Sequence, residues 1–261
     1  MFFDLYIVNA FSKGEFTGNP AAVVPLDFWI PDTTMQNIAM QNNLSETAFF
    51  VKNKNGFHIR WFTPKVEVDL CGHATLASAH VIFEILKIAE SEILFESKSG
   101  TLRVFKEDGL IFLDFPSADI QPVMQENNIY EALSSPSILS WSRAKDDFLL
   151  EFSDEISIKE LSPDFQKISQ TEARGVIVTS QSSEYDFVCR FFAPRVGINE
   201  DPVTGSAFTK LIPFWSKKLN KEQLFAKQIS DRGGEVNCKF KGERVFIGGN
   251  ASVFLKGRIE I

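Results

Sequence analysis

Apolar and polar residues alternate over many short stretches of the chain, which predicts a protein made mainly of β-strands. These stretches are rich in aromatic and β-branched residues, and Gly, Pro, Asn or Asp residues separate them. The pattern predicts strands at 2–8, 21–25, 48–52, 58–62, 92–96, 101–106, 110–115, 147–152, 175–179, 185–192 and 251–261.

Two stretches depart from this alternation and predict buried helices. Residues 73–88 are apolar on nearly every helical face, which is typical of a helix inside a core. A second such helix is expected from Ser206 to Leu219, with a kink or break at Pro213. Weaker patterns predict a short helix that Asp32 caps and a polar helix around 158–170.

A segment before each buried helix occurs twice. Residues 60–66 read RWFTPKV and residues 190–196 read RFFAPRV. Each copy leads to a small-residue turn, CGHA at 71–74 and TGSA at 204–207. Such duplication predicts two similar domains. We expect the two glycine-opened helix starts to face a shared cleft, which would suit a small anion.

Composition narrows the function classes. At 261 residues, with 44% hydrophobic and 23% charged residues, the chain is typical of a globular protein of one or two domains. A net charge of −7 argues against general nucleic-acid binding. There is no run of 18 apolar residues and no signal-like start, so we expect a cytoplasmic protein without membrane spans.

The spacing of the cysteines indicates no set of disulfide bonds. Cys71, Cys189 and Cys238 have unrelated spacings that predict neither disulfides nor a metal site. The 26 phenylalanines are interpreted as core packing.

Candidate chemistry gathers at the two turns. Gly72 would allow a tight turn, and the unpaired N–H groups of the following helix start would attract an anion. His73 could donate to a carboxylate or polarise a carbonyl, or could simply cap or pack, whereas His58 and His80 are read as structural. At the second turn, Asp201 precedes a proline and could project into a cleft or cap the helix.

Glu46 is the candidate proton carrier. It precedes the apolar residues 48–50, and desolvation at such an edge favours the neutral form of a carboxylate, which makes it a useful proton shuttle. The sequence has no nucleophile elbow, phosphate-binding loop or dinucleotide fingerprint.

Four segments together resemble the PhzF-like isomerases of phenazine biosynthesis. They are GNPAAV at 18–23, LSETAF at 44–49, CGHAT at 71–75 and DPVTGSA at 201–207, and they occur in the family order. The resemblance implies an α+β protein of two pseudo-symmetric domains with the diaminopimelate-epimerase-like fold. Each domain would wrap a curved, mostly antiparallel sheet around a central helix, over residues 1–116 and 117–250, with the strand 251–261 returning to the first domain.

The resemblance also implies roles for individual residues. Glu46 matches the catalytic acid/base, and the substrate-binding residues would be Asn19, Gly72, His73, Asp201, Gly205 and Ser206. Members of the family act without metal or organic cofactor and are usually homodimers, and the best-known activity moves a proton within a dihydro-hydroxyanthranilate ring. This chain has Phe208-Thr209 where the family often has His-Cys, which bears on the pocket wall and the substrate.

The leading hypothesis is therefore a cofactor-free isomerase of a small carboxylate. A two-base racemase or epimerase is the alternative within the same fold, although it commonly needs two thiols, and Thr204 stands at the second turn opposite Cys71 in the first. The other alternative is a protein that binds a small carboxylate without turnover.

Overall fold

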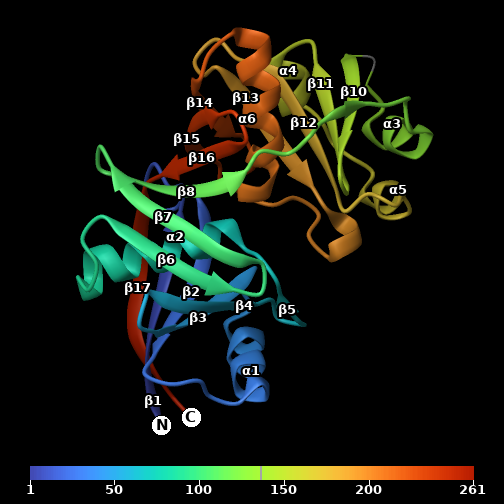
Figure 1. Ribbon diagram of the computed structural model, residues 1–261. Helices are drawn as coiled ribbons and strands as arrows, with labels where there is room; N and C mark the ends of the chain where they lie inside the picture. Colours follow the sequence, from blue (N-terminus) through green and yellow to red (C-terminus); the bar gives the residue numbers. More distant parts are fainter. Residues whose placement is uncertain (136) are drawn as a thin grey trace. The chain divides into compact units, whose positions relative to one another are not determined.

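The computed structural model describes residues 1–135 and 137–261. The chain divides into two compact units (Figure 1). The first unit contains residues 1–115 and 246–261, and the second contains residues 116–245. Each unit has its own sheet, helices and core, and each is described separately below.

The first unit is built on one mixed sheet. Its strands are β1 (Phe2–Ala10), β2 (Asn19–Leu26), β3 (Glu46–Lys52), β4 (Phe57–Phe62), β5 (Glu67–Val68), β6 (Glu92–Ser97), β7 (Gly100–Glu107), β8 (Leu110–Pro116) and β17 (Ala251–Glu260). The C-terminal β17 pairs antiparallel with β1, so the last strand lies beside the first. The strands predicted in this half all form, with ends shifted by one or two residues.

Two helices cover opposite faces of this sheet. The central α2 (Gly72–His80) continues as a π-helix (Val81–Leu86), and α2 contacts β1, β2, β3 and β17. On the other face α1 (Asp32–Asn42) packs Met35 and Ile38 against apolar side chains of β2 and β3. The prediction that Asp32 caps α1 is wrong: Pro31 holds the cap position, and the Asp32 carboxylate pairs with Arg60 at 2.8 Å.

The second unit repeats this plan. Its strands are β9 (Gln121–Pro122), β10 (Ile138–Ala144), β11 (Asp147–Phe152), β12 (Gly175–Gln181), β13 (Phe187–Phe192), β14 (Gln223–Gln228) and β15 (Gly234–Lys241), and β16 (Arg244–Gly249) crosses the boundary between the units. The long helix α6 (Gly205–Leu219) runs on across Pro213.

The smaller helices of the second unit correct one prediction. Instead of one polar helix over 158–170, there are two short helices, α4 (Glu155–Lys159) and α5 (Phe165–Ser169), beside α3 (Asn127–Leu133). Asp154 caps α4 and Asp164 caps α5 through their carboxylates. A second capping residue and Pro163 between the two helices explain why the pattern does not continue as one helix.

The order of strand pairings shows the duplication directly. In the first unit β1–β2 is antiparallel, β2–β3 parallel, β3–β4 antiparallel, β4–β6 parallel and β6–β7 antiparallel. In the second unit the pairs β10–β11, β11–β12, β12–β13, β13–β14 and β14–β15 alternate in the same way. In both units the buried helix follows the fourth strand of this series. The repeated sequence segment therefore belongs to a repeated supersecondary unit.

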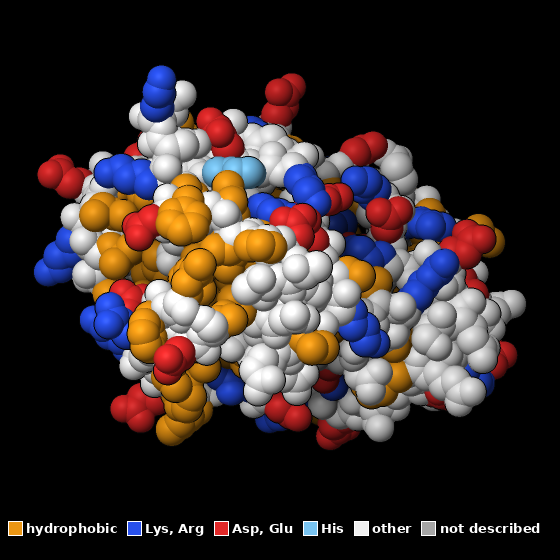
Figure 2. All heavy atoms as spheres, turned by 90° about the horizontal axis from the view of Figure 1, so that it is seen from below, with side chains coloured by type: hydrophobic (Ala, Val, Ile, Leu, Met, Phe, Trp, Pro, Cys, Tyr) orange, Lys and Arg blue, Asp and Glu red, His pale blue; other side chains and the backbone are white. Residues whose placement is uncertain are grey.

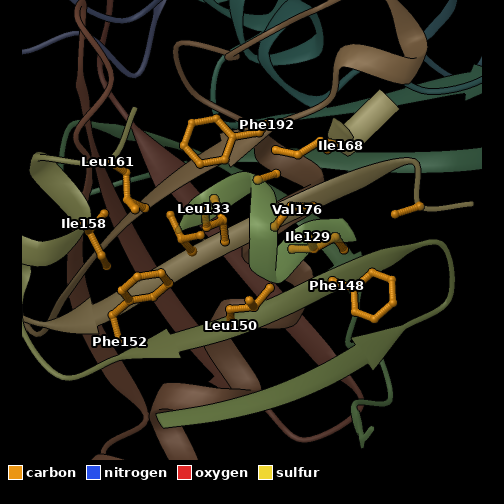
Figure 3. Packing of buried hydrophobic residues seen from close by; sticks show 13 residues of the cluster. Ile129, Leu133, Phe148, Leu150, Phe152, Ile158, Leu161, Ile168, Val176 and Phe192 are labelled. Atoms are coloured by element: carbon orange, nitrogen blue, oxygen red, sulfur yellow. The ribbon is translucent and has the colours of Figure 1, made fainter. Parts of the chain in front are cut away.

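Apolar packing holds each sheet to its helices. In the second unit Phe148, Leu150 and Phe152 of β11 and Val176 of β12 turn toward Ile129 of α3, and Figure 3 shows these side chains converging on one cluster. All are nearly inaccessible to solvent. Full burial of each such side chain contributes about 1.5–3 kcal/mol, so this cluster is a principal stabiliser of the unit.

The surface mixes charges of both signs. Figure 2 shows acidic and basic side chains interspersed over the face that it draws, with hydrophobic side chains gathered over part of it. Exposed large apolar residues include Met1, Phe2, Phe28 and Ile261. Within the two described stretches, 1–135 and 137–261, every helix is too short or too polar to cross a membrane.

Candidate active site

Asn19 is placed by a strained turn at the start of β2. Gly18 just before it has φ +82°, a left-handed conformation that favours glycine. A Cβ at Gly18 would lie 2.4 Å from the carbonyl oxygen of Ala10, so no larger residue fits without a shift of the backbone. Asn19 itself has no exposed surface. The turn thus places a buried amide side chain on the face of the sheet that α2 covers.

Glu46 lies on β3, the strand that pairs with β2, opposite the residue two positions after Asn19. It is the first residue of β3, and it pairs in parallel register with Ala21 of β2. Side chains alternate between the two faces of a strand, so Glu46 shares a face with Ala48 and Phe50, while Phe49 points toward α1. Its side chain is 13% exposed, and its carboxylate oxygen Oε2 is buried.

His73 lies in the first turn of α2. Cys71 holds the N-cap position in an extended conformation, and Gly72 is the first helical residue. Neither Gly72 nor Gly205 has a positive φ, and the role of Gly72 in allowing a tight turn stays a prediction. The N–H groups of this first turn have no partner within the helix, and the helix dipole makes this end favourable for negative charge.

The three side chains meet around the His73 imidazole. Its Nε2 lies 3.3 Å from Glu46 Oε2. Its Nδ1 lies 3.2 Å from Asn19 Nδ2 and 3.5 Å from Cys71 Sγ. Burial lowers the pKa of His73 to about 3, so the ring is neutral at physiological pH. The imidazole is hydrogen-bonded at Nδ1, whereas Nε2 and Glu46 Oε2 are in contact without the geometry of a hydrogen bond.

These ligand types are also those of a metal site. One ligand atom from each of Glu46, Cys71 and His73 lies within 4.8 Å of the others, and zinc accepts all three types. The thiol, however, contacts Nδ1 and the carboxylate contacts Nε2, on opposite sides of one ring. A single ion would bind only one of the two ring nitrogens, so it would contact the carboxylate and the thiol from one side of the ring.

In the second unit the predicted residues surround the start of α6. The hydroxyl of Thr204 donates to Asp201 Oδ2 at 2.5 Å, and the N–H of Thr204 donates to Gln228 Oε1 at 3.0 Å. Gln228 Nε2 donates to the Asp201 carbonyl at 2.6 Å. Gln228 therefore holds the turn, and the Asp201 carboxylate accepts from the Thr204 hydroxyl.

Ser206 lies within a charged network of the same unit. Its hydroxyl accepts from Arg174 Nη2 at 3.1 Å, and its carbonyl accepts from Lys210 Nζ at 3.0 Å. Both cations pair with the buried carboxylate of Asp147. Gly205 is the first residue of α6, as Gly72 is of α2.

Comparison with known proteins decides the family. The family model described as "Phenazine biosynthesis-like protein" matches residues 8–257. An uncharacterized isomerase of Pseudomonas aeruginosa is 46% identical over 258 residues, covering 99% of this chain and 98% of that protein. The chain belongs to the phenazine biosynthesis-like family.

Solved structures agree with this assignment. A PhzF-family protein of Enterococcus faecalis superimposes with a TM-score of 0.97 at 44% identity, covering all of both chains. A predicted epimerase of Pseudomonas aeruginosa shares the fold, with a TM-score of 0.78 at 17% identity over 98% of this chain and 99% of that one. The predicted epimerase-like fold and the predicted isomerase class are confirmed.

Sequence reasoning missed an ion pair that begins in each copy of the repeated segment. In the first unit Arg60 donates to both carboxylate oxygens of Glu67 at 2.7 and 2.9 Å. In the second, Arg190 donates to both oxygens of Glu200 at 2.7 and 2.8 Å. Both arginines lie in the repeated segment, but the three extra residues of the second copy displace Glu200 from the position of Glu67.

Phe208, where the family often has histidine, belongs to the core of the second unit. It has no exposed surface, and its ring lies 6.1 Å from that of Phe187. This residue fills space between α6 and the sheet. A role for it in substrate selection would have to act through this packing.

Proposed function

We propose that this protein is a cofactor-independent isomerase that moves a proton within a small carboxylate, with Glu46 as the acid/base. The observation that supports this most is the contact of the Glu46 carboxylate with a neutral imidazole at the start of a buried helix. Family membership makes isomerisation the expected reaction class, and the local chemistry suits proton transfer without any further group.

The reaction would proceed in two proton transfers. The Glu46 carboxylate takes a proton from a substrate carbon, and the electron pair left behind delocalises into the neighbouring unsaturated or carboxylate group. The protonated Glu46 then delivers the proton to a different atom of the same substrate. Fixed N–H groups at the start of α2 would stabilise the negative charge that develops between the two transfers.

His73 supports this cycle by remaining neutral. Because its pKa is lowered to about 3, it does not compete with the substrate for the proton that Glu46 carries. A small carboxylate suits the site because helix starts favour anions. The roles of Asp201, Gly205 and Ser206 in substrate binding stay a prediction, for which loss of substrate affinity in Asp201→Asn is the test.

A two-base racemase is less well supported. Cys71 contacts His73, but the matching position at α6 is Thr204. The remaining thiols are fully buried on β13 and β15, and burial raises the pKa of both Cys189 and Cys238, which disfavours the thiolates that a two-base mechanism needs.

A metabolite screen in heavy water tests the proposal. Small carboxylates are incubated with the wild-type protein and with Glu46→Gln, and mass spectrometry records mass-shifted or isomerised products. The proposal expects at least one compound that gains deuterium or changes isomer with the wild type, with a rate at least ~10²-fold lower in Glu46→Gln. Glu96→Gln, the same change on the exposed side of β6, is the matched control and should behave as the wild type.

Two results would count against the proposal. Exchange that survives in Glu46→Gln at a near-normal rate would remove Glu46 from the chemistry. A compound that is bound and remains unaltered over long incubation would favour a binding protein without turnover.

A further inference from the structure

The three contacts of the His73 ring differ in hydrogen-bonding character. At Nδ1, the amide nitrogen of Asn19 lies at 3.2 Å and can only donate, whereas the thiol of Cys71 lies at 3.5 Å and can donate or accept. The group at Nε2 is an ionisable carboxylate, which accepts when it is charged. The ring is buried, and a mismatched polar contact is costly in such surroundings.

A neutral imidazole carries one proton, so only one of two arrangements fits these neighbours. With the proton on Nε2, the Nδ1 lone pair accepts from the Asn19 amide, and the protonated nitrogen is the one nearer to the Glu46 carboxylate. With the proton on Nδ1, this N–H would face the amide N–H group of Asn19, and the Nε2 lone pair would lie nearer to the carboxylate oxygen. The thiol of Cys71 can donate or accept, so the Asn19 amide and the carboxylate favour the first arrangement.

We propose that Asn19 is a positioning residue that holds His73 in the tautomer with the proton on Nε2, the ring nitrogen that lies 3.3 Å from Glu46 Oε2. The side chain of Asn19 has no exposed surface and contacts the imidazole at Nδ1, on the side away from Glu46. The left-handed Gly18 turn is part of the same arrangement, because it fixes where the amide lies.

The consequence for catalysis rests on the proposed function. An N–H donor beside Glu46 stabilises the carboxylate, which is the form that removes a proton from carbon. Once Glu46 carries that proton, Nε2 cannot accept it because Nε2 is already protonated. The proton is therefore kept for return to the substrate, as an isomerisation within one molecule requires.

Nitrogen-15 NMR of the histidine rings tests this tautomer without any substrate. The chain has only three histidines, so assignment by single substitution is direct. His58 supplies an internal reference, because its Nδ1 accepts from Trp29 Nε1, which is only a donor, at 3.1 Å. We expect His73 to show a protonated Nε2 and an unprotonated Nδ1. A protonated Nδ1, or a population-averaged signal at both nitrogens, would overturn the inference.

A substitution then tests the role of Asn19 itself. Asn19→Asp keeps the shape of the side chain but replaces the donor by an acceptor, and it should move the His73 proton to Nδ1. Asn42→Asp is the matched control: Asn42 donates to Thr47 on the neighbouring strand, and its replacement should leave the tautomer unchanged. A tautomer that stays on Nε2 in Asn19→Asp would show that Asn19 does not determine it. Asn19→Ser, which retains a donor, serves the same test if the aspartate variant does not fold, and should preserve the Nε2 proton.

The outcome is separable from that of the proposed function. A protonated Nε2 together with undiminished turnover in Glu46→Gln would leave the tautomer assignment standing and reject the catalytic proposal. A protonated Nδ1 together with inactive Glu46→Gln would do the reverse.

Discussion

The burial of His73 predicts a specific loss of stability in weak acid. Its pKa is about 3 in the folded protein and about 6.5 in an unfolded chain. The unfolded state therefore binds a proton below pH 6.5 that the folded state does not bind until near pH 3. Stability from this residue is fully present above pH 6.5 and is lost as the pH falls toward 3.

The size of this loss of stability follows from the pH range between the two pKa values of His73. Each pH unit inside it costs about 1.4 kcal/mol, so the 1.5 units between pH 6.5 and pH 5 cost about 2 kcal/mol of unfolding free energy. Other titrating groups contribute over the same range. A comparison with His73→Gln isolates the share of His73, since glutamine preserves polarity and does not titrate.

Urea unfolding at pH 7 and pH 5 measures this difference. We expect the wild type to lose about 2 kcal/mol more than His73→Gln between the two pH values. Equal pH dependence in the wild type and His73→Gln would refute the reasoning, since it would mean that the ring is solvated or protonated in the folded state.

Three further substitutions have expected outcomes. Gly18→Ala should lower the unfolding free energy by about 1–3 kcal/mol in urea melts, because φ is +82° and the new methyl meets a backbone oxygen, whereas Gly14→Ala should be nearly neutral in its open surroundings. Glu200→Gln should cost about 1–3 kcal/mol by the same assay, because it leaves the partly buried Arg190 guanidinium without its carboxylate. Cys71→Ser should retain most of the deuterium exchange into substrate, measured by mass spectrometry, and complete loss would instead support a two-base mechanism.

Much of the architecture could be predicted because the patterns that determine it are local. Strands and turns followed from alternation and from Gly, Pro, Asn and Asp, and the duplicated segment indicated the repeated supersecondary unit. The errors occurred where local signals compete. Asp32 follows a proline that already holds the cap position, and its carboxylate is drawn to Arg60, which is distant in sequence.

The site could be predicted only in part. Glu46 and His73 are brought together by the parallel register of β2 and β3 and by the packing of α2 on them, and the motifs alone contain neither fact. The contact of the Asn19 amide with the imidazole could not be predicted for the same reason, because it depends on how α2 packs against β2. The Arg190–Glu200 pair could not be predicted from the repeat, because three additional residues separate Arg190 from Glu200 and the spacing therefore differs from that of Arg60 and Glu67.

The most direct test of the central claim is the turnover of Glu46→Gln on the first carboxylate found to be isomerised. The account predicts a rate at least ~10²-fold below that of the wild type, with unchanged urea stability and with the substrate still bound. A near-normal rate in that variant would contradict it, because the only change is the loss of an oxygen that can carry the proton.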